Sequence, residues 1–421
     1  MKIELPYGSK MLQTEIQDDQ QVKIIAIQEQ KHSIDIEEHL IKALRQPLDA
    51  SPLQSLVSSN NTVAIVIDDY TRPCPSKKIL IPLLDELDRL GIKETDIKII
   101  IATGTHKPPS VEMIKTLVGS EIFRKYTVTS NDSNNSTYVN VGTSSFGHSI
   151  EILKDYVEAD IKILIGDIEY HYFAGFGGTR KSVLPGIASA MTIQNNHSMM
   201  FEETVSKGKI DTNPVSIEMT DALDMAGCSL AISVVMNSSH DIVGLWCGNP
   251  KSVMKKGMEL VDQMYKKTLS SRPDIIIIAS DGHPHDINLY QALKALYTAS
   301  QVIAENGAII LIAACPDGMG NDRYIRWMEA YSSAPEIKEA LTEDFKIGAH
   351  KAFYHRNTIE QNQVILLSEM NASYVKDHLG FTPTDTLEHA VMKAKGMVKE
   401  QPEIIIVPQG STTHLVLDSS D

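Results

Sequence analysis

Runs of β-branched and other apolar residues, separated by amphipathic segments, constrain the fold of this chain more than any other feature. The clearest runs are TVAIVID (62–68), IKIIIATG (97–104), IKILIGDI (161–168), LAISVVM (230–236), DIIIIASD (274–281), AIILIAAC (308–315), QVILLSEM (363–370) and EIIIVPQG (403–410). Strands that alternate with helices in this way are typical of a mostly parallel sheet covered by helices. The pattern therefore predicts an α/β fold with helices flanking parallel sheets.

The length of the chain and its breaks indicate two domains. A chain of 421 residues is long for one hydrophobic core. The segment TLSSRPD separates a helical stretch from the strand that begins at 274. We expect an N-terminal α/β domain over 1–270 and a C-terminal α/β domain over 273–400. The break at KEQPE suggests that 403–421 rejoins the first domain.

Composition and charge narrow the class of protein. The net charge of −15 argues against a nucleic-acid partner, which requires a basic surface. No apolar run approaches the roughly 20 residues that span a bilayer, and MKIELPYGSK lacks the apolar core of a signal peptide. The cysteines are scattered, with no C-x-x-C pair, as expected of reduced thiols in a cytoplasmic protein; they are Cys74, Cys228, Cys247 and Cys315.

Polar segments follow the predicted strands. They are DDYTRP (68–73), GTHKPP (104–109), IEYHYF (168–173), DGHPHD (281–286) and CPDGMG (315–320). In open α/β sheets ligands bind at the carboxyl ends of strands, where such loops converge. We therefore expect one composite active site in the cleft between the two domains. The alternative is that these are ordinary polar turns.

Three side chains in these loops are candidates for substrate chemistry. An arginine at the position of Arg72 can grip a carboxylate or phosphate with two parallel hydrogen bonds, or form a surface ion pair with Asp68 or Asp69. His106 and His171 follow different strands and can transfer protons near neutral pH. A lone histidine at a strand end is more often structural.

The segment GFGGTRKS (175–182) resembles a phosphate-binding P-loop but departs from it. Arg180 stands where the P-loop requires a glycine. Gly177 and Gly178 still allow the backbone to approach a ligand closely. Lys181 can contact a phosphate, or act as a nucleophilic amine if its pKa is lowered, to which Arg180 would contribute. The alternative is a solvated basic turn.

Other candidates are weaker when taken alone. His197 lies near a short helix and could bind a metal. The HPHD segment (283–286) has zinc-like spacing, but we expect a turn and a helix N-cap at Asp286 or Asn288. Gln291 and Lys294 are neighbours on the surface of the next helix and suit a carboxylate, although the sequence alone favours ordinary solvation of the helix surface.

The segments DDYTRPCPS, ATGTHKPPS, IEYHYFAGFGGTRKSVLPGIAS, NNHS and YQALK together resemble the nickel-pincer lactate racemases and their 2-hydroxyacid racemase and epimerase relatives. They occur in the family's order and with comparable spacing over nearly the whole chain. The long central segment is the most specific of them.

The resemblance implies a cofactor and a role for each candidate residue. The cofactor is the nickel-pincer nucleotide, a pyridinium-3-thioamide-5-thiocarboxylic acid mononucleotide that binds Ni and is joined to Lys181. His197 would be the nickel ligand, and His106 and His171 the acid/base pair. Further positions match those that bind substrate or line the site: Arg72, Tyr290, Gln291 and Lys294 for substrate, and Asp69, Gly177, Gly178 and Arg180 for the cofactor.

The same resemblance implies inversion at C2 of a 2-hydroxyacid by reversible hydride transfer, with cofactor-biosynthesis enzymes as partners. Tyr70 stands where a histidine is common, and IGAHKAFYH (347–355) lacks the family's tryptophan. These departures leave the substrate open among lactate, another short hydroxyacid and a larger one. An NAD-dependent 2-hydroxyacid oxidoreductase is a second hypothesis, although no G-x-G-x-x-G follows an early strand. A non-catalytic nucleotide- or anion-binding protein is a third.

Overall fold

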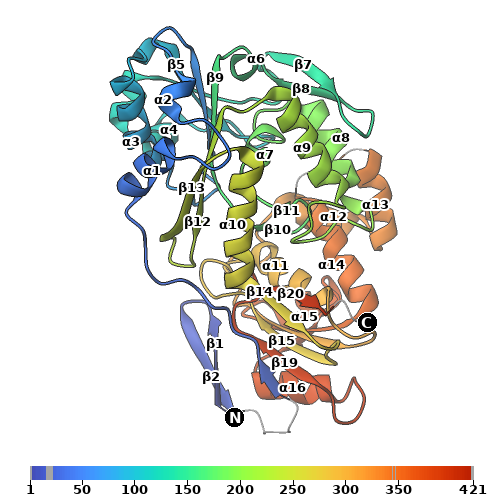
Figure 1. Ribbon diagram of the computed structural model, residues 1–421. Helices are drawn as coiled ribbons and strands as arrows, with labels where there is room; N and C mark the ends of the chain where they lie inside the picture. The colour runs from blue at the N-terminus through green and yellow to red at the C-terminus, as the bar shows by residue number, and fades with distance from the viewer. Residues whose placement is uncertain (1, 16–21, 344, 347, 419–421) are drawn as a thin grey trace. The chain divides into compact units, whose positions relative to one another are not determined.

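The chain forms two compact units in the computed structural model, which describes residues 2–15, 22–343, 345–346 and 348–418 (Figure 1). One unit is Glu29–Met264. The other joins Met1–Gln28 to Tyr265–Asp421. Among the described residues, no helix has both the length and the apolar character needed to cross a membrane.

The unit Glu29–Met264 is built on a six-stranded sheet of order β13-β12-β9-β4-β5-β6. All neighbouring strands are parallel except β12 and β13, which are antiparallel. Four of these strands are runs that the sequence predicted. The strands are β4 (Val63–Asp68), β5 (Ile97–Ala102), β6 (Thr127–Ser130), β9 (Ile161–Asp167), β12 (Leu230–Met236) and β13 (Ile242–Gly248).

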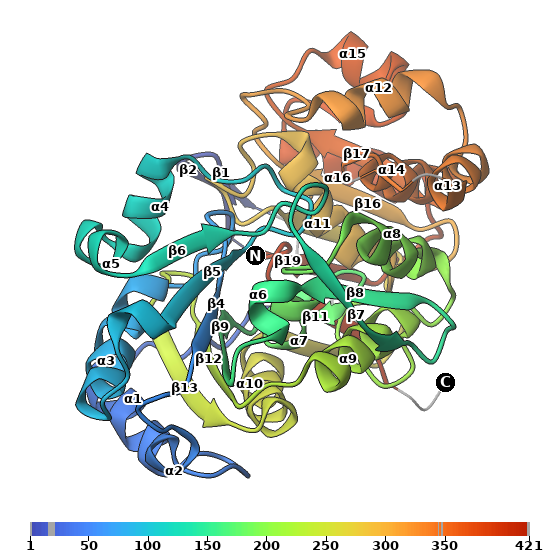
Figure 2. The same ribbon diagram turned by 90° about the horizontal axis from the view of Figure 1, so that it is seen from above.

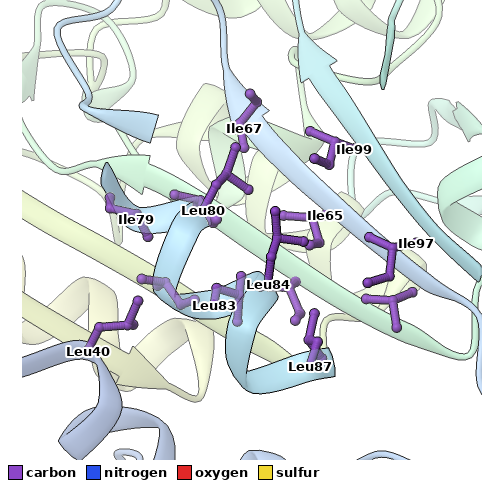
Figure 3. Packing of buried hydrophobic residues seen from close by; sticks show 14 of the residues in the cluster. Leu40, Ile65, Ile67, Ile79, Leu80, Leu83, Leu84, Leu87, Ile97 and Ile99 are labelled. Carbon is purple, nitrogen blue, oxygen red and sulfur yellow. The ribbon is translucent and has the colours of Figure 1, made fainter. Parts of the chain in front are cut away.

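Helix α3 (Ser76–Arg89) covers one face of this sheet (Figure 3). Its leucines recur at helical spacing, and Leu80, Leu83 and Leu87 are each 0% exposed. They pack with Ile65 and Ile99 of the strands and with α1 (Ile36–Arg45). Burial of each such side chain stabilises the fold by about 1.5–3 kcal/mol.

Other helices and two hairpins complete this unit (Figure 2). In that view α3 and α1 lie on one side of the sheet, and α7, α9 and α10 lie on the other. The hairpins are β7 (Tyr138–Thr143) with β8 (Ser149–Leu153), and β10 (Tyr170–His171) with β11 (Gly175–Phe176). The remaining helices are α2 (Leu53–Leu56), α4 (Val111–Val118), α5 (Ser120–Lys125), α6 (Lys154–Val157), α7 (Arg180–Val183), α8 (Ala190–Ser198), α9 (Pro214–Ala226) and α10 (Pro250–Tyr265).

The second unit has its own six-stranded sheet, of order β18-β17-β16-β15-β19-β3, in which all neighbours are parallel. Alternate residues of its strands form a core with α16 (Leu387–Lys395) and with strand β1. The strands are β3 (Val22–Ile24), β15 (Ile275–Ala279), β16 (Ala308–Ile312), β17 (Gln363–Leu367), β18 (Thr382–Thr384) and β19 (Ile404–Val407). These two sheets with flanking helices confirm the predicted α/β class.

The described part of the second unit also contains short strand pairs and five further helices. The pairs are antiparallel β1 (Lys2–Tyr7) with β2 (Lys10–Glu15), and parallel β14 (Lys266–Leu269) with β20 (His414–Leu417). The helices are α11 (Leu289–Ser300), α12 (Asp322–Ala330), α13 (Ala334–Glu343), α14 (His350–Gln361) and α15 (Ala372–Asp377).

The end of the chain corrects one expectation. The segment 403–421 was expected to rejoin the first domain, but β19 pairs with β15 and β20 pairs with β14, both in the second unit. Every residue of β19 is buried, so this strand needs a partner on each side, and it lies between β15 and β3. Residues 419–421 of the segment lie outside the described residues.

Candidate active site

The strand order of the first unit determines where ligand-binding loops meet. From β4 the chain moves outward through β5 to β6, and it later returns to the opposite side of β4 as β9. The strand order therefore reverses between β4 and β9, and in open α/β sheets this reversal opens the ligand-binding crevice at the carboxyl edge. Arg72 lies in the loop after β4, His106 in the loop after β5, and His171 in the loop after β9.

Asp69 and His106 form a hydrogen-bonded pair at this edge. His106 Nδ1 donates to Asp69 Oδ2 at 2.7 Å, across neighbouring strands β4 and β5. The same carboxylate accepts from the Thr71 hydroxyl at 2.6 Å. Burial acts to raise the pKa of Asp69, but the bonds from His106 and Thr71 outweigh it and lower that pKa. Asp69 is therefore a stable anion that leaves His106 Nε2 as a proton acceptor.

Arg72 lies between acidic side chains from two strand ends. Its Nη1 is 3.2 Å from Glu169 Oε1, and both side chains are partly exposed. Behind this ion pair, the Asp167 backbone N–H donates to Asp68 Oδ2 at 3.2 Å. Burial raises the pKa of both Asp68 and Asp167, so this carboxyl pair is expected to hold a proton at neutral pH.

The glycine-rich turn after β9 is a tight hairpin followed by one turn of helix α7. Gly178 has φ +81°, and a Cβ there would lie 2.8 Å from the Asp167 carbonyl oxygen, so only glycine fits. The Gly104 N–H donates to the Gly186 carbonyl at 2.9 Å. This bond joins the loop of His106 to the turn that carries Lys181.

The Lys181 amine is poised for chemistry that an ordinary lysine cannot perform at neutral pH. Burial and the charge of Arg72 lower its pKa to about 7, with a smaller contribution from Arg180. The sequence analysis attributed a lowered pKa of Lys181 to Arg180, but the charge of Arg72 lowers that pKa more. Near pH 7 about half of these amines are the nucleophilic free base.

Arg180 is buried with part of its hydrogen-bonding capacity unused. Its Nη2 donates to the carbonyls of Ala174 at 2.9 Å and Phe176 at 3.2 Å, which fixes the hairpin. Its Nε and Nη1 have no hydrogen-bond partner among the described residues, and the side chain is 4% exposed. Buried charged donors without partners are costly, so this guanidinium favours an anionic ligand.

His171 and His106 use their ring nitrogens differently. The Ala174 backbone N–H donates to His171 Nδ1 at 3.2 Å. The neutral ring of His171 therefore carries its proton on Nε2, whereas that of His106 carries it on Nδ1. The His171 ring also stacks on Tyr172 and meets Phe173 edge-on.

His197 lies on α8 and is 4% exposed. Burial and the nearby charge of Lys181 lower its pKa to about 3, so the ring is neutral at physiological pH. A neutral imidazole is the form that binds a metal. The structure therefore brings the predicted nickel ligand within electrostatic range of the predicted attachment lysine.

Tyr290, Gln291 and Lys294 lie on α11 in the other unit. Asn288 caps this helix by accepting from the Gln291 N–H at 3.1 Å, as the sequence analysis proposed for that position. The roles of these three residues in substrate binding stay predictions.

Among the described residues, the group that could hold a metal through three side chains is Asp68, Cys74 and Asp167. The HPHD segment forms a turn at 283–286, as the sequence predicted. The thiol of Cys74 is fully buried, and burial raises its pKa well above its usual value. This group therefore fits a protonated carboxyl pair beside a neutral thiol better than a cation site.

Some charged residues near the candidates were not singled out from the sequence. Glu169 and Asp167 belong to the same strand end as His171, and that position was the only signal they offered. Lys351, on α14, is 6% exposed and lies 5.1 Å above the Tyr290 ring. Burial and the charge of Lys294 lower the pKa of Lys351 to about 7. A lysine on a helix is expected to be exposed to solvent, so the sequence alone gave no reason to single out Lys351.

Comparison with known proteins assigns the family. Residues 7–208 match the family model of the lactate racemase N-terminal domain, and residues 268–414 match that of the C-terminal domain. A lactate racemase from Thermoanaerobacterium thermosaccharolyticum is 32% identical over 420 residues, covering 97% of both chains. The chain belongs to the lactate racemase family. The resemblance inferred from the sequence motifs is confirmed.

A second lactate racemase and two solved structures are also similar to this chain. A lactate racemase from Lactiplantibacillus plantarum is 30% identical and covers 97% of this chain and 98% of its own. The structure of the Thermoanaerobacterium lactate racemase apoprotein aligns with a TM-score of 0.88 at 30% identity, over 99% of this chain and all of that one. A Thermotoga maritima structure aligns with a TM-score of 0.61 at 20% identity, over 91% of this chain and 97% of that one, and shares the fold.

Proposed function

We propose that this protein is a racemase or epimerase that inverts C2 of lactate or a related 2-hydroxyacid. Membership of the lactate racemase family supports the reaction class. One structural observation carries the mechanism: His106 and His171 follow β5 and β9, the two neighbours of β4, whose own loop supplies Arg72. Two proton-transfer groups on different loops beside one anion-binding arginine suit a reaction that must serve two mirror-image substrates.

The residues present fit the nickel-pincer nucleotide. Lys181 offers an amine that is substantially unprotonated near pH 7, as attachment through a thioamide requires. Arg180 has two buried donors without partners among the described residues, which suit an anionic group such as a phosphate. His197 is a neutral imidazole, and its nitrogen would be the protein's ligand to the cofactor's nickel. The bound cofactor would supply the acceptor and donor of the hydride.

The protein's own groups would bind the substrate and move its hydroxyl proton. Arg72 would hold the carboxylate, because a guanidinium binds carboxylates through two parallel bonds. His106 Nε2 would accept the hydroxyl proton of one enantiomer, and the Asp69 carboxylate would stabilise the resulting imidazolium. His171 would serve the hydroxyl proton of the other enantiomer.

The two histidines would not act identically. His106 can take up a proton at Nε2 while keeping its bond to Asp69. His171 accepts from the Ala174 N–H through Nδ1. Because Nε2 of the neutral ring already carries a proton, His171 can take up another only at Nδ1, and the contact with Ala174 would have to break, since both ring nitrogens of an imidazolium are donors. The turn between β10 and β11 would therefore adjust during one half of the reaction.

The substrate-binding roles of Tyr290, Gln291 and Lys294 belong to the same proposal, as do a cytoplasmic location and the cofactor-biosynthesis enzymes as partners. Lactate is the substrate that both curated relatives name. The Tyr70 departure leaves room for another hydroxyacid. A chiral assay of a hydroxyacid panel on cofactor-loaded protein identifies the substrate.

The test compares wild type with Lys181→Ala, both produced together with the cofactor-making enzymes. Intact-mass measurement should show an added mass on wild type that is absent from the variant, and the chiral assay should show no racemisation by the variant. Lys209→Ala, which changes a lysine outside the proposed machinery, is the control and should keep both properties. Full racemase activity in Lys181→Ala would overturn the proposal.

A further inference from the structure

A chain of buried hydrogen bonds leads from His197 to the adjacent helix α9. His197 Nδ1 is 3.1 Å from Oδ1 of Asn196, its neighbour on α8. The Asn196 side chain is 0% exposed. The Phe173 ring meets the His197 ring edge-on at 5.0 Å between centroids and restricts its rotation.

The Asn196 amide can have only one orientation. Its Nδ2 donates to the Val215 carbonyl and to Glu218 Oε2, each at 3.0 Å. Exchanging the amide oxygen and nitrogen would place an oxygen against two acceptors. Oδ1 therefore faces His197, and because an amide oxygen only accepts, His197 Nδ1 must be the donor.

Glu218 is the anchor of this chain and is 0% exposed. Its Oε1 accepts from the Ser144 hydroxyl at 2.7 Å and lies 2.7 Å from His148 Nδ1. With Asn196 on Oε2, three donors meet the two carboxylate oxygens. A glutamine would offer only one oxygen to these donors, so the arrangement requires a carboxylate.

We propose that Asn196 and Glu218 are positioning residues that fix His197 with its proton on Nδ1 and its lone pair on Nε2. They would act on His197 through these hydrogen bonds. An imidazole that binds a metal through one nitrogen is oriented by the bond that the other nitrogen makes. The metal-binding role of His197 rests on the proposed function; the ring orientation and tautomer do not.

The tautomer is measured without cofactor and without turnover. Long-range ¹H–¹⁵N NMR of ¹⁵N-histidine-labelled apoprotein distinguishes the two ring nitrogens, and His197→Gln assigns the signal. Wild type should show His197 as the Nδ1–H tautomer. Asn196→Ala and Glu218→Gln should each produce a second population with the proton on Nε2. Asn131→Ala is the matched control, because Asn131 is also 0% exposed, donates to a carbonyl and accepts from Tyr138.

A second readout is nickel content after loading with cofactor. Changes to groups that orient a metal ligand typically weaken metal binding 10- to 100-fold. Asn196→Ala and Glu218→Gln should therefore lose nickel about tenfold faster than wild type and Asn131→Ala during dialysis against a chelator.

The outcomes separate the two proposals. Finding His197 as the Nε2–H tautomer in wild type would overturn the positioning role, even if Asn196→Ala fails to fold. The positioning role would also be overturned if both variants kept the wild-type tautomer of His197 and the wild-type rate of nickel loss. The predicted tautomer in a protein that binds no nickel would leave the hydrogen-bond chain standing and contradict the proposed function instead.

Discussion

Two buried aspartates, one in each unit, follow strands of similar sheets but do different work. Asp69, after β4, is 3% exposed and binds the imidazole of His106. Asp286, after β15, is 1% exposed, and its Oδ2 accepts from the backbone N–H groups of Gly8 at 2.6 Å and Ala314 at 3.1 Å. One carboxylate orients a side chain that can transfer a proton, and the other holds backbone segments together.

The charged groups around the two aspartates also differ. Near β4 and β9, buried or partly buried charged groups adjoin one another and shift each other's pKa, as Lys181 and Arg72 show. Near β15, Asp281 accepts from the N–H groups of Ser411 and Thr412 and closes a turn. Perturbed ionisable groups mark functional sites more often than satisfied ones do. Lys351 in the second unit is perturbed as well, so the observation that favours the first unit for the proposed proton chemistry is the carboxylate of Asp69 bound to the His106 imidazole.

The largest expected effect tests this assignment directly. His106→Ala and His171→Ala should each lower kcat by up to about 10⁴-fold, because each removes one general acid/base group. The chiral assay should be run from both enantiomers. His389→Gln, which changes an exposed histidine paired with Asp385 in the second unit, should keep wild-type activity. Activity above a tenth of wild type in either alanine variant would place the proton transfer elsewhere.

Two lysines, the partly buried Lys181 and the buried Lys351, sharpen the comparison, because both have a pKa of about 7. A lowered lysine pKa means that the reactive free base predominates above pH 7 rather than above about 10.4. At pH 7 the free-base fraction should be about 10³-fold above that of an ordinary lysine. Amine acetylation of apoprotein, followed by peptide mass spectrometry, should give midpoints near pH 7 at both sites. Denatured protein is the control, and midpoints near 10 in the folded protein would contradict the prediction.

Asp69→Asn should have a smaller effect than loss of either histidine. The amide oxygen can still accept from His106, but the negative charge that stabilises the imidazolium is gone. We expect kcat to fall about 10²-fold with little change in the midpoint of thermal unfolding. Asp96→Asn changes an aspartate outside the site and serves as the control. A stability loss without a kcat effect would make Asp69 a structural residue like Asp286.

Asp286→Ala should have the smallest effect on turnover and a clear effect on stability. It leaves the buried N–H of Ala314 and the partly buried N–H of Gly8 without an acceptor, and an unsatisfied buried N–H costs about 1–3 kcal/mol. Thermal unfolding should shift to lower temperature, while kcat per folded molecule stays at the wild-type value. A large fall in kcat with unchanged unfolding would remove the contrast between the two aspartates.

Much of the fold could be predicted because local patterns are consistent with it. All eight apolar runs contain strands, and the leucines of α3 recur at helical spacing. The placement of 403–421 could not be read locally, because the sequence marks a buried strand but not which edge it will join. That depends on β15 having an open side.

Some residues of the candidate site could likewise be found from the sequence, and others could not. The sequence singled out Lys181, His106 and His171 because glycine-rich and histidine-bearing loops after strands are unusual. His197 was weak alone and received its proposed role from the family resemblance. Partners such as Glu169, Glu218 and Lys351 were missed, since a single acidic or basic residue on a strand end or helix reads as solvated.

The sequence by itself determined the α/β class, the family and the chemical types available at the strand ends, because these depend on local periodicity and on motifs. Only the tertiary structure decided which of these side chains contact one another. It placed Asp69 against His106, 37 residues away, and it buried Lys181 beside Arg72. Proton affinities and ring orientations follow from desolvation and from contacts between distant segments, and no local pattern encodes those.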